Sequence, residues 1–421
     1  MRILVVILLT VSSLLSQAQW GRHSGTFSRD NAFWYSGNSE DSLATFSSIR
    51  PYHVPHSPEN DSLFADRGFS ISSGDHTFRV LPLLENRIQT DFSDAFHFTS
   101  NGVALGYQFS DKLWTEGYAT YNHASFMPFL DSIDQAIGQY PSFGPDMQTR
   151  QGGFNWGGSV IWNTGKFFLL EAGRQRNSFG DGYRSLLLSE YAPEYPFLRI
   201  QTTLWRFRYV NLFNFMQHRG DLMENSGYEQ FRKFSTMHYL CFNWKNKFEI
   251  GIFEAVVWQG QDTLLRRGFD INYLNPIIFY RPVEFSLGSS DNALIGLNIR
   301  YSPWENVSVY CQLMLDEFFL REIRQDLKHL FRPNDTTVQH GWWANKYGFQ
   351  LGVKAHEPFG IDGLSGLFEF NMVRPYTFTH GSVYQSYSHN NHSLSHPLGA
   401  NFREWVAMVQ YRWGRFRVSN R

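Results

Sequence analysis

The chain has 421 residues, with 37 basic and 38 acidic side chains and a formal net charge of −1. This balance argues against nucleic acid as a partner, because nucleic-acid-binding proteins concentrate Lys and Arg on one surface. Aromatic residues make up 17% of the chain, a share typical of the aromatic girdles that a membrane β-barrel places at both interfaces.

The first eighteen residues, 1–18, have the features of a secretory signal peptide. Arg2 supplies the positive start, Ile3–Leu9 form the apolar core, and the small residues Ser16 and Ala18 mark a cleavage site. The apolar run is too short for a permanent membrane helix, which needs about 20 apolar residues. We therefore expect an exported protein that is cleaved near Ala18.

Residues 19–75 form an irregular, polar segment with many Ser, Asn, Asp and Pro residues. Two apolar clusters, at residues 33–35 and 63–64, give this segment side chains to bury, and this favours a folded cap or plug. An unstructured tail is the alternative.

Residues 76–421 alternate apolar and polar side chains in short runs that are separated by turn residues. Such a period of two indicates β-strands with one apolar face. The pattern is clearest where Tyr347, Phe349, Leu351 and Val353 alternate with Gly348, Gln350, Gly352 and Lys354. Large apolar residues on one face and small or polar residues on the other are typical of a barrel wall.

We therefore expect an all-β fold, a transmembrane antiparallel β-barrel with long loops. At about ten residues per strand plus turns and loops, the 403 residues that follow a signal of eighteen suit roughly 16 to 18 strands. A soluble β-sandwich is the alternative, but it would have to bury these faces in one unit of about 400 residues, beyond the usual domain size.

Two later segments lack this alternation. Glu317–Phe331 has apolar residues at helical spacing and is followed by Pro333, so it predicts an amphipathic helix at a barrel mouth. Thr379–Ala400 is rich in His, Ser, Asn and Tyr and has no periodicity, so it predicts a long loop.

The alternation also predicts which charged side chains face the interior. They carry both signs: Glu171, Glu249, Glu369, Arg206, Arg208, Arg300, Lys354 and Arg412. Mixed charges pair with one another and with an inserted segment, whereas a selective pore tends to display one sign at its constriction. The pattern favours a filled or narrow lumen over an open porin.

The two cysteines fall on opposite faces of their predicted strands. Cys241 alternates with the apolar residues Leu240 and Phe242, whereas Cys311 shares its face with the apolar Leu313. One thiol then faces the lumen and the other the lipid, so we expect two free thiols.

The loop at 379–400 contains four histidines, His380, His389, His392 and His396. No Cys or carboxylate lies among them, so polar loop residues are favoured over a metal site. Tyr rings beside His, Ser and Asn groups suit a saccharide-binding surface, because rings cover sugar faces and polar groups bond hydroxyls. The candidate saccharide contacts are Tyr384, Tyr387, His389, His392, His396, Trp342 and Trp343. The two tryptophans also suit an interface girdle.

Three stretches of the chain carry a resemblance to a known family. They are Gly180–Arg199 (GDGYRSLLLSEYAPEYPFLR), Asn272–Asn292 (NYLNPIIFYRPVEFSLGSSDN) and His396–Glu404 (HPLGANFRE). These stretches resemble signatures of the capsule assembly Wzi family. The resemblance implies an outer-membrane barrel of eighteen strands, with small helices closing the periplasmic end, that holds surface polysaccharide.

Most residues of these stretches are interpreted as structural. Their glycines suit turns, and Arg184 suits a clamp on neighbouring carbonyls or carboxylates; the alternative makes Asp181, Tyr183 and Arg184 ligand contacts. The family-motif residues are Gly180, Asp181, Gly182, Tyr183, Arg184, Asn275, Pro276, Arg281, Pro282, Glu284, Pro397, Gly399 and Asn401.

The sequence lacks a Gly-x-Ser-x-Gly elbow, a His-Glu-x-x-His pair and a phosphate-binding Gly-Lys-Ser/Thr run, so we expect no enzyme activity, cofactor or metal. The leading hypothesis is an outer-membrane barrel, embedded in outer-membrane lipid, that binds or anchors surface polysaccharide for capsule or exopolysaccharide assembly. A gliding-motility or adhesion protein is the first alternative. A porin or a secretion-accessory barrel is the second, and both alternatives allow motility or secretion proteins as partners.

Overall fold

The computed structural model describes residues 46–50, 69–90, 95–124, 153–223, 227–261, 268–276, 291–316, 345–413 and 416–420. Most of these residues lie in β-strands, so the all-β fold expected from the sequence is confirmed. The signal peptide, most of the segment 19–75 and the helix expected at 317–331 lie outside the described residues. None of the helices in the described part is both long enough and apolar enough to cross a bilayer.

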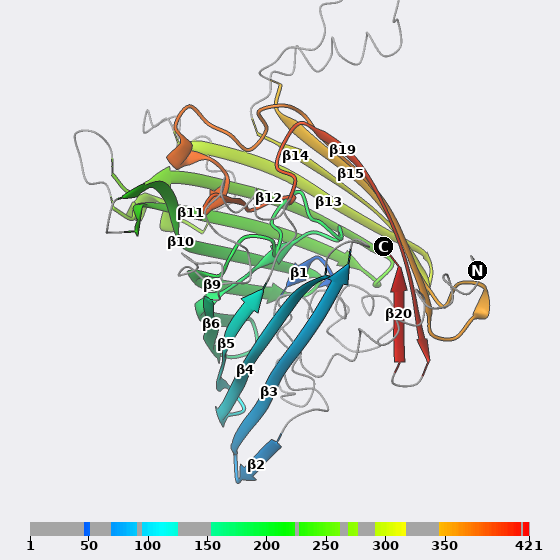
Figure 1. Ribbon diagram of the computed structural model, residues 1–421. Helices are drawn as coiled ribbons and strands as arrows, with labels where there is room; N and C mark the ends of the chain where they lie inside the picture. Colours follow the sequence, from blue (N-terminus) through cyan, green and yellow to red (C-terminus); the bar gives the residue numbers. More distant parts are fainter. Residues whose placement is uncertain are drawn as a thin grey trace, which may run out of the picture.

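One large sheet of sixteen antiparallel strands organises the described chain (Figure 1). In spatial order the strands are β2 (Phe69–Ser73), β3 (His76–Thr90), β4 (Ala95–Ser110), β5 (Leu113–Ala124), β6 (Gly153–Asn163), β7 (Phe168–Gln175), β9 (Tyr195–Leu204), β10 (Phe207–Met223), β11 (Gly227–Trp244), β12 (Phe248–Gln259), β13 (Asn292–Trp304), β14 (Val307–Leu315), β15 (Tyr347–His356), β16 (Leu364–Val373), β19 (Phe402–Trp413) and β20 (Phe416–Asn420). The sheet curls around a concave side. Its edge strands β2 and β20 are not paired with each other in the described residues, so closure and a count of eighteen strands stay predictions.

Smaller elements accompany the large sheet. Two two-stranded pairs lie apart from it, β1 (Ile49–Arg50) with β8 (Ser178–Phe179), and β17 (Ser388–His389) with β18 (His392–Ser393). The described ranges also contain three short 3₁₀ helices: η3 (Ile271–Leu274), η4 (Pro358–Gly360) and η5 (Val383–Gln385).

The two ends of the sheet differ in the length of their connections. At one end, neighbouring strands are joined by short turns, such as the two-residue turns between β4 and β5, β9 and β10, and β13 and β14. At the other end the connections are long, and they include residues 176–194 and 374–401. These two ends are called the short-turn end and the long-connection end below.

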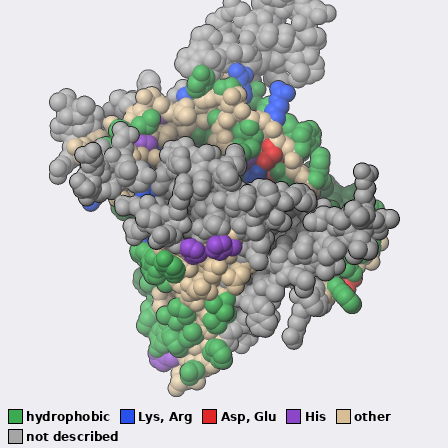
Figure 2. Space-filling view, viewed as in Figure 1, with side chains coloured by type: hydrophobic (Ala, Val, Ile, Leu, Met, Phe, Trp, Pro, Cys, Tyr) green, Lys and Arg blue, Asp and Glu red, His purple; other side chains and the backbone are tan. Residues whose placement is uncertain are grey.

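Side chains alternate between the two faces of the sheet, because successive residues of a strand point to opposite sides. In β6, exposed and buried positions alternate along almost the whole strand, with Trp156 and Trp162 exposed and Asn155, Ser159 and Ile161 buried. Figure 2 shows hydrophobic side chains gathered over the strands drawn at the lower left, β3, β4 and β5. The predicted barrel-wall pattern of apolar outer and small or polar inner residues is confirmed.

An apolar core lies on the concave side, where wall strands meet inserted loops. Leu186, Leu187 and Leu188 are fully buried in it. Wall residues of the same core come from strands across the sheet, and they include Phe197, Leu212, Met237, Phe253, Leu294, Met314 and Val373. The interior is therefore packed with side chains where these segments enter.

Most of the charges predicted to point inward do so. Glu171, Glu249, Glu369, Arg300 and Lys354 are buried on the concave face. Arg208 lies over the ring of the buried Phe46, at 4.3 Å from its centroid. The prediction for Arg206 was wrong, because this residue lies in the β9–β10 turn with its guanidinium 3.9 Å from the Trp244 ring centroid. The side chain of Arg412 lies outside the described residues.

Candidate functional site

Two inserted segments occupy the concave side and form the candidate site. The first inserted segment, residues 176–194, leaves β7, passes β8 and returns to the wall at β9. The second inserted segment, residues 374–401, joins β16 to β19 and contains β17 and β18. The first contains most of the stretch 180–199, and the second contains the start of the stretch 396–404, both of which carry the family resemblance.

Glycines allow the first inserted segment to run against the wall. Gly180 has a φ of +109°, and a Cβ added there would lie 2.0 Å from Gln312 Nε2. A Cβ at Gly182 would lie 1.9 Å from Gln350 Oε1. A Cβ at either position would displace a buried Gln side chain from its hydrogen bonds, and the positive φ of Gly180 disfavours other residues as well.

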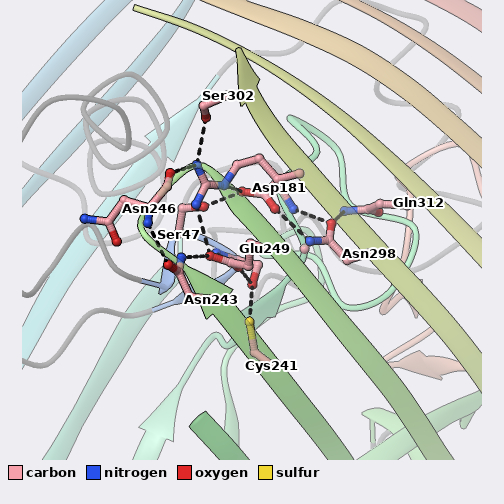
Figure 3. A network of polar contacts seen from close by, with 12 residues as sticks. Ser47, Asp181, Cys241, Asn243, Asn246, Glu249, Asn298, Ser302 and Gln312 are labelled. Carbon is pink, nitrogen blue, oxygen red and sulfur yellow. Dashed lines mark hydrogen bonds and ion pairs between the residues drawn. The ribbon is translucent and has the colours of Figure 1, made fainter. Parts of the chain in front are cut away.

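Asp181 anchors the first inserted segment to strand β13 (Figure 3). Its backbone N–H donates to Asn298 Oδ1 at 3.0 Å, and Asn298 Nδ2 donates back to Asp181 Oδ2 at 2.7 Å. The Ser47 hydroxyl donates to Asp181 Oδ1 at 2.5 Å. Burial alone raises the pKa of Asp181, but the nearby Arg300 charge and these hydrogen bonds bring it below the usual value. The carboxylate is therefore ionised and held by the wall.

Arg300 links Asp181 to a second buried carboxylate, Glu249. The distances are 3.7 Å from Arg300 Nε to Asp181 Oδ1 and 3.2 Å from Nη2 to Glu249 Oε2. The Ser48 hydroxyl also donates to Glu249, next to Cys241. Residues 46–50, which belong to the N-terminal segment expected to be a cap or plug, are thus held inside the sheet.

Polar side chains of the wall also bond the backbone of the first inserted segment. The Tyr183 N–H donates to Glu369 Oε2 at 2.8 Å, and the Leu186 N–H donates to Gln312 Oε1 at 2.8 Å. Gln350 Nε2 donates to the Arg184 carbonyl at 2.8 Å. These bonds replace the strand or helix partners that an irregular buried backbone lacks.

The second inserted segment packs on the first. The Tyr387 hydroxyl donates to the Leu187 carbonyl at 2.8 Å, and the Ser395 hydroxyl donates to the Leu186 carbonyl at 2.7 Å. Between β17 and β18, Asn390 and Asn391 have φ values of 47° and 65°. Two residues at positive φ form the tight hairpin turn that lets this loop fold back into the interior.

The stretches 180–199 and 396–404, which carry the family resemblance, meet at Glu404. Arg184 forms an ion pair with Glu404, and His396 Nε2 lies 2.9 Å from Glu404 Oε2. Asn371 Nδ2 donates to the same oxygen at 3.1 Å. Burial lowers the pKa of His396, although the Glu404 charge opposes this effect. Arg184 therefore binds a neighbouring carboxylate, as predicted from the sequence for a residue with a structural role.

A small pocket lies where the inserted segments meet strand β1. Arg50 and Arg184 contribute to its lining together with Tyr183, Tyr191 and Glu190. The remaining lining residues are Ser178, Ser185, Ser189 and Pro397. Arg50 was not predictable from the sequence, because it lies in an irregular polar stretch without periodicity or motif.

The structure buries four of the saccharide contacts predicted from the sequence: Tyr387, His389, His392 and His396. His389 Nδ1 accepts from the Gln217 N–H at 3.1 Å, and burial, aided by the nearby Lys233 charge, lowers the pKa of His389 to about 3. These side chains therefore do not form an exposed surface.

Tyr384 is half-buried at the long-connection end. Its ring centroid lies 4.6 Å from that of Phe231 and 5.2 Å from that of His218. Trp342 and Trp343 lie outside the described residues. Of the five candidate contacts whose structure is described, Tyr384 is thus the one with solvent access.

The remaining motif residues have mainly backbone roles. Gly399 and Asn401 have φ values of 66° and 62°, in the turn that leads into β19. The Pro276 carbonyl accepts from the Tyr209 hydroxyl at 2.6 Å, next to Asn275. Arg281, Pro282 and Glu284 lie outside the described residues. Within the described ranges, no group of three or more His, Cys, Asp or Glu side chains is arranged to hold a metal ion.

Comparisons with known proteins indicate the class of the fold. No family model matches the chain, and no curated protein matches it. Among solved structures, it is similar to Wzi of Escherichia coli, described as an outer-membrane protein involved in group 1 capsule assembly and as a carbohydrate-binding β-barrel. The TM-score is 0.53 at 14% identity, over 95% of this chain and 83% of Wzi.

Two further solved structures align over 82% of this chain. The first is OmpF of Salmonella typhi in complex with daunomycin, with a TM-score of 0.41, 8% identity and 89% of that chain covered. The second is OccK5 of Pseudomonas aeruginosa, with a TM-score of 0.33, 12% identity and 86% of that chain covered. The likeness to Wzi, together with the large antiparallel sheet, shows that the chain has the fold of an outer-membrane β-barrel protein.

Proposed function

We propose that this protein lies in the outer membrane and binds or anchors a surface polysaccharide at its long-connection end. The exposed apolar residues of the outer face support the membrane location, because a barrel wall presents an apolar band with aromatic girdles to lipid. They include Trp156, Trp162, Leu198, Phe207, Trp244, Leu351, Phe368 and Trp405. Outer-membrane barrels have short periplasmic turns and long outer loops, so the long-connection end faces outward in this proposal.

The filled interior is the observation that carries the proposal. A diffusion pore needs a continuous aqueous lumen, whereas Leu186, Leu187 and Leu188 are fully buried against the wall on the concave side. The ion pairs of Arg300 with Asp181 and Glu249 tie the same segment to the wall. A barrel occupied in this way suits binding at its surface better than conduction through its centre.

The sugar-binding part of the proposal draws on exposed rings at the long-connection end. Tyr376 is 60% exposed and Tyr384 is half-buried, and both belong to the second inserted segment. Flat rings with hydroxyls suit the faces and polar edges of sugars. The likeness to Wzi, itself described as carbohydrate-binding, supports the same ligand class. Many shallow contacts along one polymer then supply the avidity.

The buried candidates have a supporting part in this proposal. Tyr387, His389, His392 and His396 fix the fold of the second inserted segment, so that Tyr376 and Tyr384 are presented at its surface. Replacing the whole loop would remove buried side chains as well as exposed ones. Point variants of the exposed rings are therefore the sharper test.

The test measures binding of purified, detergent-folded protein to the surface polysaccharide of the producing cell. The wild type is compared with the double variant Tyr376→Ala and Tyr384→Ala. Phe359→Ala is the matched control, because Phe359 is 95% exposed in the turn between β15 and β16 at the short-turn end. Saturable binding that the double variant loses and the control keeps supports the proposal.

Absence of binding by the wild type would refute the polysaccharide proposal. Conductance of the same protein in planar bilayers then tests the porin alternative, since a steady open channel would contradict a filled interior. A barrel that binds polymer and does not conduct agrees with both parts of the proposal.

A further inference from the structure

We propose that the pocket between strand β1 and the inserted segments binds a carboxylate group carried by the polysaccharide, so that the ligand is an acidic polymer. This inference rests on the proposed function and adds the chemical class of the sugar. It is carried by one residue, Arg50, whose charge has no counterion in the described part of the chain.

Arg50 is a buried cation, with 4% of its surface exposed. Its Nη2 donates to Ser178 Oγ at 3.0 Å and to the Gly180 carbonyl at 3.1 Å. Its Nε is buried and has no hydrogen-bond partner. These neutral partners leave the positive charge uncompensated, which is costly in an interior of low dielectric constant.

Three other arginines of the interior have carboxylate partners. Arg300 pairs with Glu249 at 3.2 Å, Arg199 with Glu171 at 3.7 Å, and Arg176 with Glu194 at 3.1 Å. Arg50 departs from this pattern. A bound anion would compensate this charge.

The lining of the pocket suits a sugar carboxylate. Arg184, 30% exposed, adds a second guanidinium beside the Tyr183 ring. A guanidinium fork matches the two oxygens of a carboxylate, and the Ser and Tyr hydroxyls of the lining suit sugar hydroxyls. Glu190 is the one acidic side chain of the described lining, and Arg184 is already paired with Glu404, which leaves Arg50 as the lining cation without an ion pair in the described residues.

The size of the pocket limits what enters it. Its enclosed volume is about 10 Å³, the space of about one water molecule, so one oxygen of a carboxylate fits it and a whole sugar ring does not. The proposed ligand therefore places its carboxylate at Arg50 while the ring stays at the rim, near Tyr191 and Pro397. A uronic acid or another acidic substituent of the polymer has this shape.

The test compares the native surface polysaccharide with the same polymer after reduction of its carboxyl groups to alcohols. The wild type should bind the reduced polymer at least about tenfold more weakly, because a charge-assisted hydrogen bond is lost. Arg50→Gln should bind both polymers equally, at the level of the wild type with the reduced polymer. Arg50→Lys keeps the charge without the guanidinium fork, so its affinity for the native polymer should lie between those of the wild type and Arg50→Gln.

Folding of each variant is checked by heat-modifiable migration in gels, and the exposed Arg403→Gln is the matched control for loss of one positive charge. Equal binding of native and reduced polymer by the wild type, or native binding unchanged in a folded Arg50→Gln variant, would overturn the inference and leave the proposed function standing.

A second arm uses free glucuronate and acetate as probes of thermal stability. If neither polymer binds, the proposed function fails. Protection by glucuronate or acetate that Arg50→Gln abolishes would then retain the carboxylate site for a free anion and refute its assignment to a polymer. No protection and no polymer binding would refute the site itself.

Discussion

Arg300 and Glu249 form an ion pair inside the sheet, with 3.2 Å between Nη2 and Oε2 and at most 3% of either side chain exposed. They lie on neighbouring wall strands, where residues 249 and 300 are directly paired. Asp181 of the first inserted segment joins this pair through Arg300, and Ser48 of the N-terminal segment joins it through Glu249. One wall arginine thus connects both segments that enter the interior.

The variant Arg300→Gln should destabilise the protein by about 3–5 kcal/mol, because it leaves two buried carboxylates without their countercharge. Urea titration of the protein in liposomes, followed by tryptophan fluorescence, measures the free energy of unfolding. Arg403→Gln is the control, since Arg403 is exposed on the outer face. A loss no larger than that of the control would contradict this account of the network.

The variant Gly352→Ala should cost about 1–3 kcal/mol of stability through overpacking. A Cβ at Gly352 would lie 2.2 Å from Cζ of Tyr310, whose hydroxyl donates to Glu369 Oε2 at 2.6 Å. Gly366→Ala, on the adjacent strand, is the matched control, because no atom lies within 4 Å of a Cβ added there. The same urea titration checks the difference, and equal effects of the two variants would refute tight packing at Tyr310.

The alternation of the wall was predictable from the sequence, because the period of two records directly which face each residue occupies. Residues 347–354 show this best, since their apolar set faces outward and Gly348, Gln350 and Gly352 face the interior. Arg206 was misplaced because a turn interrupts the alternation just before β10. A register argument fails at such a position since turn residues follow no strand period.

The contacts of the inserted segments were not predictable in the same way. Asp181 and Asn298, or Tyr387 and Leu187, are separated by more than 100 positions, and their pairing follows from how the curved sheet brings distant strands together. Polar composition alone suggested an exposed loop at 379–400. The structure instead satisfies many of those polar groups internally, so His389 and His396 are buried with hydrogen-bond partners.

Stability should fall as the pH decreases below about 6, and His389 should account for part of the loss. Its pKa is lowered by burial to about 3 in the folded protein, against 6.5 as the ordinary value. Between these values the unfolded chain binds a proton that the folded chain excludes, so acid favours unfolding. Protonation would also remove the Nδ1 acceptor of the Gln217 N–H.

The variant His389→Asn, which keeps a side-chain acceptor, should reduce this pH dependence. The wild type is expected to lose up to roughly 1.4 kcal/mol per pH unit more than the variant between pH 6 and pH 4. Unfolding in urea at several pH values measures both slopes. Parallel slopes for the two proteins would show that His389 is not a buried neutral histidine.

The two thiols should react differently with reagents that reach them through lipid or through water. Cys241 is fully buried on the concave face beside Ser48, whereas Cys311 is half-buried on the outer face, in register with Ile299 and Leu351. This placement confirms that the cysteines occupy opposite faces.

In liposomes, a lipid-soluble maleimide should label Cys311 quickly, a charged maleimide should label it slowly, and Cys241 should react only after unfolding. Peptide mapping by mass spectrometry identifies the labelled thiol, with Cys311→Ala as the control for assignment. Rapid labelling of Cys311 by the charged reagent would contradict a lipid-facing wall, and a peptide linking Cys241 to Cys311 would contradict the register of both strands.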